Sequence, residues 1–598
     1  MPIYKAPIQD NLFLLNDVFH IEQHADIPGY ADLSADILEA TLNEAAKLSE
    51  QVLAPLNKVG DTEGCRRHDD GSVTTPKGFK EAFKQFAEGG WMGVSAPVEF
   101  GGQGLPVVLN GIITEFIAAS NLAFWMYAGL TEGAISALID HASPEQKSLY
   151  LPKMIAGKWT GTMNLTEAHS GTDLGLLRTK AKPQADGSYK INGTKIFISA
   201  GDHDMAENII HLVLARIEGA PSGVHGISLF VVPKYLLKAD GALGENNSVS
   251  CGSIEHKMGI HGNCTCVMNF DDASGWLVGG ENHGLNAMFT MMNHARLSVG
   301  THGLAISDVA YQNAAAYAKD RLQGRSLSGT KFPDKPADPI IVHPDVRRSL
   351  MTIRALTEAA RALIVWTGIR HDIALGSADS RARELAEDHM GLMTPVIKAF
   401  CTDAGFENAV IAQQMYGGHG YIAENGMEQF VRDARINQIY EGANGIQALD
   451  LAGRKLAMND GRAVKAFFSE VDAFLKKQSG TDSMLPYINP VRNALGNLQQ
   501  ATMWIVKHSS ENHDEIGGAS YEFLRLFGLT AFGYMWCRMV EAAQISRANA
   551  SRDKKEFLDA KFATASFFMQ RILPETSALL ARIEAGVSSM MKLPPEAF

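Results

Sequence analysis

The sequence predicts a mainly α-helical protein with a central β domain, and three observations carry this prediction. Apolar residues recur at helical spacing from about residue 33 to residue 158. From about 159 to 272 they alternate with polar residues or form short β-branched runs, and no helix of useful length separates these runs. Helical spacing returns near residue 286 and persists to the C-terminus. This order favours layered helical domains around one β domain.

These changes of pattern divide the 598 residues into five segments, close to the roughly four domains that the length predicts. They are an N-terminal extension (1–32), a helical domain (33–158), a β domain (159–272), a helical bundle (273–460) and a second helical domain (461–598). The Asn192-Gly193 pair predicts a hairpin turn, and we expect a compact antiparallel β domain around it. A polar, Pro-bearing stretch from Gly480 to Pro490 predicts a linker or long loop.

Two starts of helices can be placed from local signals. The segment Gly78 to Ala87 predicts one helix, and Pro144 with Glu145 opens another after the capping residue Ser143.

Composition excludes several classes of protein. Apolar residues make up 46% and charged residues 20%, which is typical of a globular chain. The net charge of −12 argues against a non-specific nucleic-acid binder, which needs a basic face. Six Cys without CxxC spacing indicate neither a disulfide framework nor a zinc ribbon. No signal-peptide pattern and no window of membrane-spanning length stand out, so we expect a cytoplasmic protein with no integral membrane segment.

Three segments resemble known sites but lack a required feature. The glycine-rich turn from Pro97 to Pro106 has no Lys-Ser/Thr of a P-loop. Gly418-His-Gly-Tyr-Ile-Ala423 matches GxGxxA, but it follows a helix, whereas a dinucleotide fingerprint follows a strand. His20 and His24 share helical spacing without the zincin order, so no metal site is predicted.

The segment best suited to catalysis is Tyr440-Glu441-Gly442-Ala443-Asn444, which places a carboxylate at a break between two apolar runs. Gly442 permits a backbone geometry that other residues resist. Two interpretations follow from the segment alone. Glu441 either caps the next helix, as acidic residues near helix N-termini often do, or points into a pocket.

Four motifs in chain order resemble those of the acyl-CoA dehydrogenase flavoproteins. They are similar to the family's Pro-Glu-Glu-Tyr-Gly-Gly turn, its Thr-Glu-Pro-x-x-Gly-Ser-Asp segment, its Gln-x-x-Gly-Gly-x-Gly turn and its Ile-Tyr-Glu-Gly-Thr-Asn-x-Ile-Gln segment. Their positions are Pro97–Gly104, Leu165–Asp173, Gln414–Tyr421 and Arg435–Gln447. The resemblance covers about residues 33–456, and the first residues and extra C-terminal helices are similar to a long bacterial subgroup.

The resemblance implies the acyl-CoA dehydrogenase fold, with an N-terminal helical domain, a β-barrel-like domain, a four-helix bundle and, here, an added helical domain. It implies FAD as cofactor and oxidation of an acyl-CoA to its trans-2-enoyl product. Glu441 is then the base for the α proton, and flavin N5 takes the β hydride. Electrons are expected to pass to an electron-transfer flavoprotein. A carboxylate base works best in a dry pocket that raises its pKa, and the thioester oxygen needs preplaced donors.

The resemblance also carries over further site residues by position. Cofactor-binding positions are Leu165, Thr166, Thr172, Phe197, Ser199, Arg321, Gln414, Gly417, Gly418 and Ala443. Substrate-binding positions are Thr172, Asn293, Arg296 and Gly442. Departures from the family pattern are Ala168-His169 in place of Pro-Gly, and Ala443 in place of Thr.

The extra helical domain leads us to expect a homodimer, because it can cover the surface on which relatives of ordinary length form tetramers. Two alternatives remain for the function. One is an acyl-CoA oxidase of the same fold, which differs in how reduced flavin meets oxygen. The other is a non-catalytic helical scaffold without flavin. The acyl group is not determined by the sequence.

Overall fold

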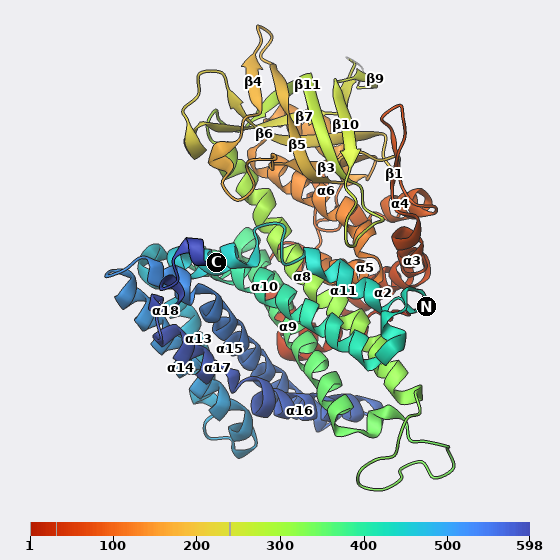
Figure 1. Cartoon of the computed structure of the whole chain (residues 1–598), viewed down its shortest axis with the longest axis vertical. Coiled ribbons are helices and arrows are strands. Elements are labelled where there is room, and N and C mark those ends of the chain that lie inside the picture. Colours follow the sequence, from red (N-terminus) through yellow and green to blue (C-terminus); the bar gives the residue numbers. More distant parts are fainter. Residues whose placement is uncertain (1, 32, 239–240) are drawn as a thin grey trace. The chain divides into compact units, whose positions relative to one another are not determined.

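The computed structural model describes residues 2–31, 33–238 and 241–598. The chain forms two compact units. The bundle unit contains Met1–Asn43, Pro106–Ala119 and Val299–Phe598, and the sheet unit contains Glu44–Leu105 and Ser120–Ser298. Three helices have residues in both units: α2 (Ala35–Lys47), α5 (Val107–Ser120) and α8 (Gly284–Asp320). Figure 1 shows the mainly helical content and the β strands, as the sequence predicts.

The helices that lie wholly in the sheet unit start and stop at recognisable signals. They are α3 (Ala54–Glu63), α4 (Phe79–Glu88), α6 (Leu122–His141) and α7 (Pro144–Ile155). Gly78 immediately precedes α4 and has φ +85°. Ser143 and Gln146 form a capping box at the start of α7, which satisfies two amides there. Both predicted helix starts are therefore confirmed.

Helix α6 is more apolar than the sequence analysis recognised. It is long and apolar enough to cross a membrane by length and composition, so the expectation that no window reaches that length is wrong. However, 83% of its apolar window is buried inside the protein. This burial is typical of a core helix, and α6 packs against β3 and α7.

The strands of the sheet unit form one large and two small sheets in the described part of the chain. The large sheet contains β3 (Trp159–Asn164), β4 (Lys180–Pro183), β5 (Tyr189–Ser199), β6 (Asn208–Ile217), β7 (Ile227–Pro233), β10 (Val249–Ile254) and β11 (Thr265–Val278). The small sheets pair β1 (Arg66–Arg67) with β2 (Val73–Thr74), and β8 (Tyr235–Leu237) with β9 (Leu243–Asn246). Strand β7 pairs with both β6 and β11, so the pairings of β11, β5, β4, β6 and β7 close into a ring, which is barrel-like.

Two details of this β domain differ from the prediction. The β3–β6 and β4–β6 pairs are parallel, because the chain between β3 and β6 is long enough for a crossover. The Asn192-Gly193 pair is not a turn, since β5 continues through it. A Cβ on Gly193 would lie 2.4 Å from Thr179 Oγ1, so glycine here permits close packing within the sheet. The hairpin between β4 and β5 turns at residues 184–187, where Gly187 has φ +84°.

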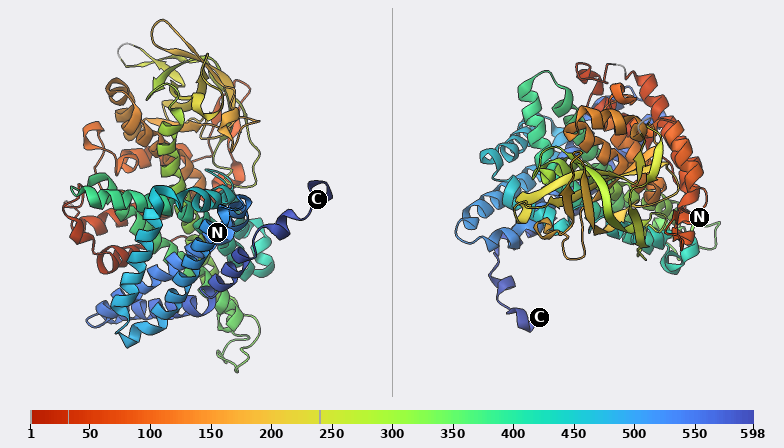
Figure 2. Two further views of the ribbon diagram at one scale, coloured as in Figure 1. Left: turned by 90° about the vertical axis from the view of Figure 1, so that its left-hand side faces the viewer. Right: turned by 90° about the horizontal axis from the view of Figure 1, so that it is seen from above.

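The bundle unit contains the long helices. Its elements include α1 (Ile8–Leu12), α9 (Pro344–Gly376), α10 (Ser380–Met415), α11 (Met427–Ile436) and α12 (Asn444–Asp450). The C-terminal helices are α13 (Arg462–Gln478), α14 (Leu485–Ser509), α15 (Asp514–Arg547), α16 (Arg552–Phe567), α17 (Glu575–Glu584) and α18 (Ser588–Met591). Helices α9 and α10 lie side by side, and α15 packs on α9, α10 and α12 (Figure 1). In both views of Figure 2, the chain from α18 onward projects away from the other C-terminal helices.

The predicted loop from Gly480 to Pro490 is much shorter in the structure. Helix α14 already begins at Leu485, so the second half of the expected loop is helical. Pro486 lies in the first turn, where a missing backbone N–H costs nothing. Pro490 follows one turn later inside the helix. Counting prolines as breaks therefore misplaced this boundary.

A buried cluster of charges joins three distant parts of the bundle unit. The Arg361 guanidinium on α9 lies 2.7 Å from Glu115 Oε1, 3.2 Å from Asp308 Oδ1 and 3.8 Å from Asp10 Oδ2. On the preceding turn of α9, Glu358 is 2.8 Å from Lys561 Nζ of α16, and Lys561 also binds Asp10. Through this cluster the N-terminal extension and a C-terminal helix are both attached to α9.

Candidate active site

The turn that carries Glu441 has an unusual backbone. Helix α11 ends at Ile436, α12 begins at Asn444, and Ala443 occupies the N-cap position. Ala443, not Glu441, is therefore the N-cap residue of α12. Glu441 has φ +55° and Gly442 has φ +88°. A non-glycine residue in the left-handed region costs on the order of 1 kcal/mol or more and persists only where its surroundings impose it.

Buried polar side chains hold this turn from the side of α10. The Asn444 amide nitrogen donates to Asp403 Oδ1 at 2.7 Å, and its oxygen accepts from Lys398 Nζ at 2.8 Å. Lys398 is completely buried. Gln438, on the other side of Glu441, donates to the same Asp403 oxygen at 2.7 Å. Both ends of the turn are thus bound to one carboxylate.

A second polar group lies on the other side, around Tyr440. The Tyr440 hydroxyl donates to Asn437 Oδ1 at 2.8 Å and lies 3.1 Å from His302 Nδ1 of α8. Burial lowers the pKa of His302 to about 3, so its ring is neutral in the physiological range. Burial, and then the Glu441 charge, raise the pKa of Tyr440 well above its usual value. Tyr440 is therefore a neutral anchor beside the carboxylate.

The predicted flavin segment lies in the sheet unit, directly after β3. Leu165 and Thr166 are half-buried, and the Leu165 carbonyl accepts from Lys195 Nζ at 2.9 Å. Lys195 also forms an ion pair of 2.9 Å with Glu167, and both side chains are buried. Thr179 and the Arg178 amide donate to Glu167 as well, at 2.6 and 2.7 Å. The Lys195–Glu167 pair therefore fixes the backbone of the Leu165–Glu167 segment.

Both members of the Lys195–Glu167 pair are expected to be charged at neutral pH. Burial alone raises the pKa of Glu167, but the Lys195 charge and the hydrogen bonds outweigh it and lower that pKa to about 2. Burial lowers the pKa of Lys195 to about 8. The sequence alone indicates no role for either residue. Glu167 lies in a recognised motif, but no sequence signal connects it with a lysine in a strand 28 residues away.

Phe197 and Ser199 lie at the end of β5, where the strand is bulged. Cys266 pairs with Ile198 and Met268 with Lys195, so two residues of β5 face one of β11. Phe197 at the bulge has φ +59° and is 60% exposed. The Ile196 amide donates to the Thr166 carbonyl at 2.9 Å, which brings the bulge next to the Leu165–Thr166 segment. The sheet unit thus presents an exposed aromatic ring beside a fixed, half-exposed backbone.

The remaining predicted binding residues of the sheet unit lie in two places. Thr172 is exposed in the loop after Glu167. Asn293 and Arg296 lie together on α8, where the guanidinium donates to Asn293 Oδ1 at 3.3 Å. Asn293 is exposed, whereas Arg296 is buried.

The remaining predicted residues of the bundle unit lie where α8 and α10 end. Gly417 follows α10, has φ +56°, and an added Cβ on Gly417 or Gly418 would meet nothing within 4 Å. Gln414 and Arg321 are exposed. Tyr317 and Tyr416 stack with ring centroids 4.0 Å apart, which joins the end of α8, where Arg321 follows, to the glycine turn. An exposed cation and an open glycine backbone are suited to phosphate and nucleoside groups.

The predicted residues therefore form local groups within each unit. Glu441, Gly442, Ala443, Arg321, Gln414, Gly417 and Gly418 belong to the bundle unit. Leu165, Thr166, Thr172, Phe197, Ser199, Asn293 and Arg296 belong to the sheet unit. Their chemistry fits the separate parts of FAD: Phe197 and the Leu165–Thr166 backbone suit an aromatic ring with a polar edge, and Arg321 and the open glycine turn suit phosphates and a nucleoside. In the described part of the chain, no group of three His, Cys, Asp or Glu side chains is arranged to bind a metal.

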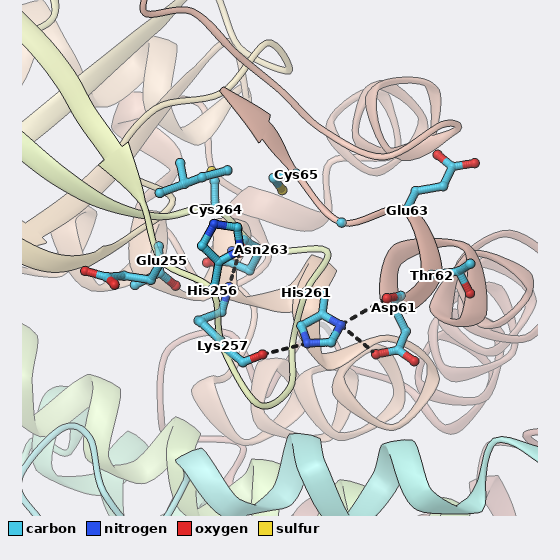
Figure 3. A pocket seen from close by; sticks show the side chains of 13 residues that line it. Asp61, Thr62, Glu63, Cys65, Glu255, His256, Lys257, His261, Asn263 and Cys264 are labelled. Carbon is cyan, nitrogen blue, oxygen red and sulfur yellow. Dashed lines mark hydrogen bonds and ion pairs between the residues drawn. The ribbon is translucent and has the colours of Figure 1, made fainter. Parts of the chain in front are cut away.

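A hollow of ≈ 320 Å³ elsewhere in the sheet unit does not contain these residues. The end of α3, the segment before β1, and the chain from β10 to β11 line it (Figure 3). Three of its charged groups already have partners. His261 lies 3.1 Å from Asp61, whose hydrogen bond raises the His261 pKa to about 9, and Lys257 donates to the Asn263 carbonyl at 2.8 Å. We therefore do not assign the active site to this hollow.

Comparison with known proteins accounts for almost the whole chain. Family models described as acyl-CoA dehydrogenase N-terminal domain, middle domain and C-terminal domain match residues 41–158, 162–273 and 282–456. A model described as acetyl-CoA dehydrogenase C-terminal like matches residues 467–594.

Individual relatives agree with these models over their full length. A 3-methylmercaptopropionyl-CoA dehydrogenase of Ruegeria pomeroyi is 42% identical over 98% of this chain and 99% of its own. A broad-specificity linear acyl-CoA dehydrogenase of Mycobacterium tuberculosis is 33% identical over the whole of both chains. The fold matches an acyl-CoA dehydrogenase from Bacillus anthracis complexed with FAD, with a TM-score of 0.74 at 22% identity over 97% of this chain and 92% of that one. With four motifs, four domains and these relatives in agreement, the chain belongs to the acyl-CoA dehydrogenase family of flavoprotein enzymes.

Proposed function

We propose that this protein uses FAD to oxidise an acyl-CoA thioester to its trans-2-enoyl-CoA, with Glu441 as the base that removes the α proton. The observation that carries the proposal is the Glu441 turn, with two successive positive φ values and both ends bound to one buried carboxylate. Such strain is retained where a side chain has to be aimed. The half-buried position of Glu441 also limits hydration of its carboxylate.

The residues of the turn have complementary roles in this proposal. The Glu441 carboxylate accepts the α proton, and its backbone N–H is the donor that polarises the thioester carbonyl. The left-handed geometry at Glu441 and Gly442 lets one residue direct both groups. Bound flavin would supply the hydride acceptor, which no amino-acid side chain provides. Leu165, Thr166 and Phe197 would orient its ring.

The anaerobic flavin spectrum tests the proposal. We expect the purified protein to be yellow and the flavin to bleach when a suitable acyl-CoA is added without oxygen. The panel should include a thioether acyl-CoA, butyryl-CoA and other linear acyl-CoAs, because similar proteins are named for 3-methylmercaptopropionyl-CoA, butyryl-CoA and linear acyl-CoAs. A colourless protein would contradict it and favour the scaffold alternative. A yellow protein that no member of the panel bleaches would also contradict it.

We further propose an electron-transfer flavoprotein as the electron acceptor, because this is the usual partner of dehydrogenases in the family. The alternative is an acyl-CoA oxidase of the same fold. Stoichiometric release of hydrogen peroxide during aerobic turnover would identify the oxidase instead. The reducing environment of the cytoplasm, our proposed location, suits the six free cysteines.

A homodimer is the assembly that we propose. The argument is the added C-terminal block, which a model described as acetyl-CoA dehydrogenase C-terminal like matches at residues 467–594 and which packs on α9, α10 and α12. Size-exclusion chromatography with light scattering is expected to give a mass near twice the 64.8 kDa of the chain. A mass near four times that value would refute the dimer.

A further inference from the structure

Asp403 on α10 binds both the Glu441 turn and a C-terminal helix, α15. Its Oδ1 accepts from Gln438 and from Asn444, each at 2.7 Å. Its Oδ2 accepts from the Tyr521 hydroxyl of α15. Asp403 is only 6% exposed, so these hydrogen bonds are shielded from water.

The two turn residues bound by Asp403 enclose Glu441 on both sides. Gln438 lies three residues before Glu441, and Asn444 lies three residues after it. The backbone N–H of Asn444 also donates to the backbone carbonyl of Gln438 at 3.1 Å, which closes the turn. A carboxylate that joins the ends of so short a loop restricts the path of the residues between them, and Glu441 is at the centre.

The orientation of Asn444 is set by its other partners. Lys398 Nζ donates to the Asn444 oxygen at 2.8 Å, and Thr402 Oγ1 accepts from its nitrogen at 2.9 Å. The amide nitrogen is thereby directed at Asp403. Because Lys398, Thr402 and Asp403 are on one helix, α10 supplies all of the side chains that hold Asn444 in place.

Helix α10 is itself held rigidly next to Asp403. An added Cβ on Gly405 would lie 2.4 Å from the Gly303 carbonyl oxygen, so α8 and α10 touch backbone to backbone there. Helix α15 also contacts α10 beside Asp403. Arg525 of α15 lies one turn after Tyr521 and forms an ion pair of 3.6 Å with Glu407 of α10. Removing the Tyr521 hydroxyl therefore leaves α15 attached to α10 by a second contact.

We propose that Asp403 is a positioning residue for Glu441, and that Tyr521 makes the geometry of the base depend on the C-terminal helices. This inference rests on the proposed role of Glu441 as base. It gives the added domain a function within the reaction: α15 supplies a hydrogen bond that fixes the carboxylate supporting the base. Neither residue is placed in contact with substrate or flavin.

The test compares Asp403→Asn and Tyr521→Phe with the wild-type holoenzyme. The matched control is Tyr534→Phe, which removes another buried hydroxyl of α15, whose nearest partner is Arg538 at 3.5 Å. We expect kcat to fall about tenfold to a hundredfold in Asp403→Asn, as for a misplaced catalytic group. For Tyr521→Phe we expect about fivefold, the equivalent of one net hydrogen bond. KM should stay within about twofold in both variants, because substrate contacts are unchanged.

A second readout does not depend on activity. Hydrogen–deuterium exchange of the amides from 437 to 444 should become faster in both variants and stay unchanged in Tyr534→Phe. Unchanged exchange and kcat in both variants would overturn the proposal, and so would faster exchange with a wild-type kcat. If Asp403→Asn does not fold, Tyr521→Phe decides alone. If the wild-type protein oxidises no acyl-CoA, the proposed function fails, whereas the exchange data still decide whether Asp403 holds the turn.

Discussion

Glu441→Gln is expected to lower the turnover of acyl-CoA by ~10²–10⁴-fold, the range typical for loss of a general base. Gln has nearly the shape of Glu and keeps the backbone of the turn, but its amide cannot accept the α proton. We therefore expect the variant to remain yellow and to bind acyl-CoA with about the same affinity. Single-turnover bleaching of the flavin measures the chemical step, and perturbation of the flavin spectrum on binding measures affinity.

An exposed carboxylate of the bundle unit provides the control for this variant. Glu424 lies in the exposed short helix from Ala423 to Asn425, and Glu424→Gln should leave turnover unchanged. Near-normal turnover in Glu441→Gln would refute the assignment of Glu441 as the base. Loss of flavin from Glu441→Gln would also count against it, because the residue would then be needed for assembly of the site.

Arg361→Met is expected to produce a large loss of stability. The guanidinium lies among Glu115, Asp308 and Asp10, and it is only 2% exposed. Met fills much of the volume but leaves these buried carboxylates without their cation. Breaking a buried ion pair on one side typically costs about 3–5 kcal/mol. The denaturation midpoint in urea, followed by fluorescence and circular dichroism, measures the loss.

The pH dependence gives this prediction a sign. Burial raises the pKa of Asp308 in the folded protein, and the charges of Glu115 and Asp10 raise it further, while Arg361 opposes them. Without Arg361, the pKa of Asp308 in the folded protein rises further. A carboxyl with a raised folded pKa binds its proton more tightly in the folded state, so stability falls as pH rises through that pKa. The defect of Arg361→Met should therefore be larger at neutral pH than in mild acid.

Arg348→Met on the same helix is the matched control. Arg348 forms an exposed pair of 2.9 Å with Asp345, and both side chains are more than half exposed. Exposed pairs of this kind contribute about 0–1 kcal/mol, so the midpoint should barely change. If Arg361→Met is as stable as Arg348→Met, the charge cluster does not hold the N-terminal extension and α16 to α9.

The sequence by itself determined the order of domains, the family and the identity of the proposed base. These conclusions rest on local patterns: the spacing of apolar residues, short motifs in order, and the Glu441-Gly442 pair. Such patterns are visible in the sequence because they reflect the geometry of a single helix, strand or turn. The same locality explains the errors. Asn192-Gly193 has the composition of a turn, but packing of Thr179 against Gly193 keeps it in a strand.

Only the tertiary structure decided how the proposed base and the predicted flavin segment are held. The left-handed backbone of Glu441 follows from its surroundings, since no propensity of Glu favours it. Asp403 and Tyr521 are 118 residues apart, and Glu167 and Lys195 are 28 apart. A hydrogen bond between such residues forms only when the fold brings them together, and it leaves no periodic signal in either segment. The residues proposed to perform the chemistry could therefore be read from motifs, whereas those proposed to position them became visible only in the folded chain.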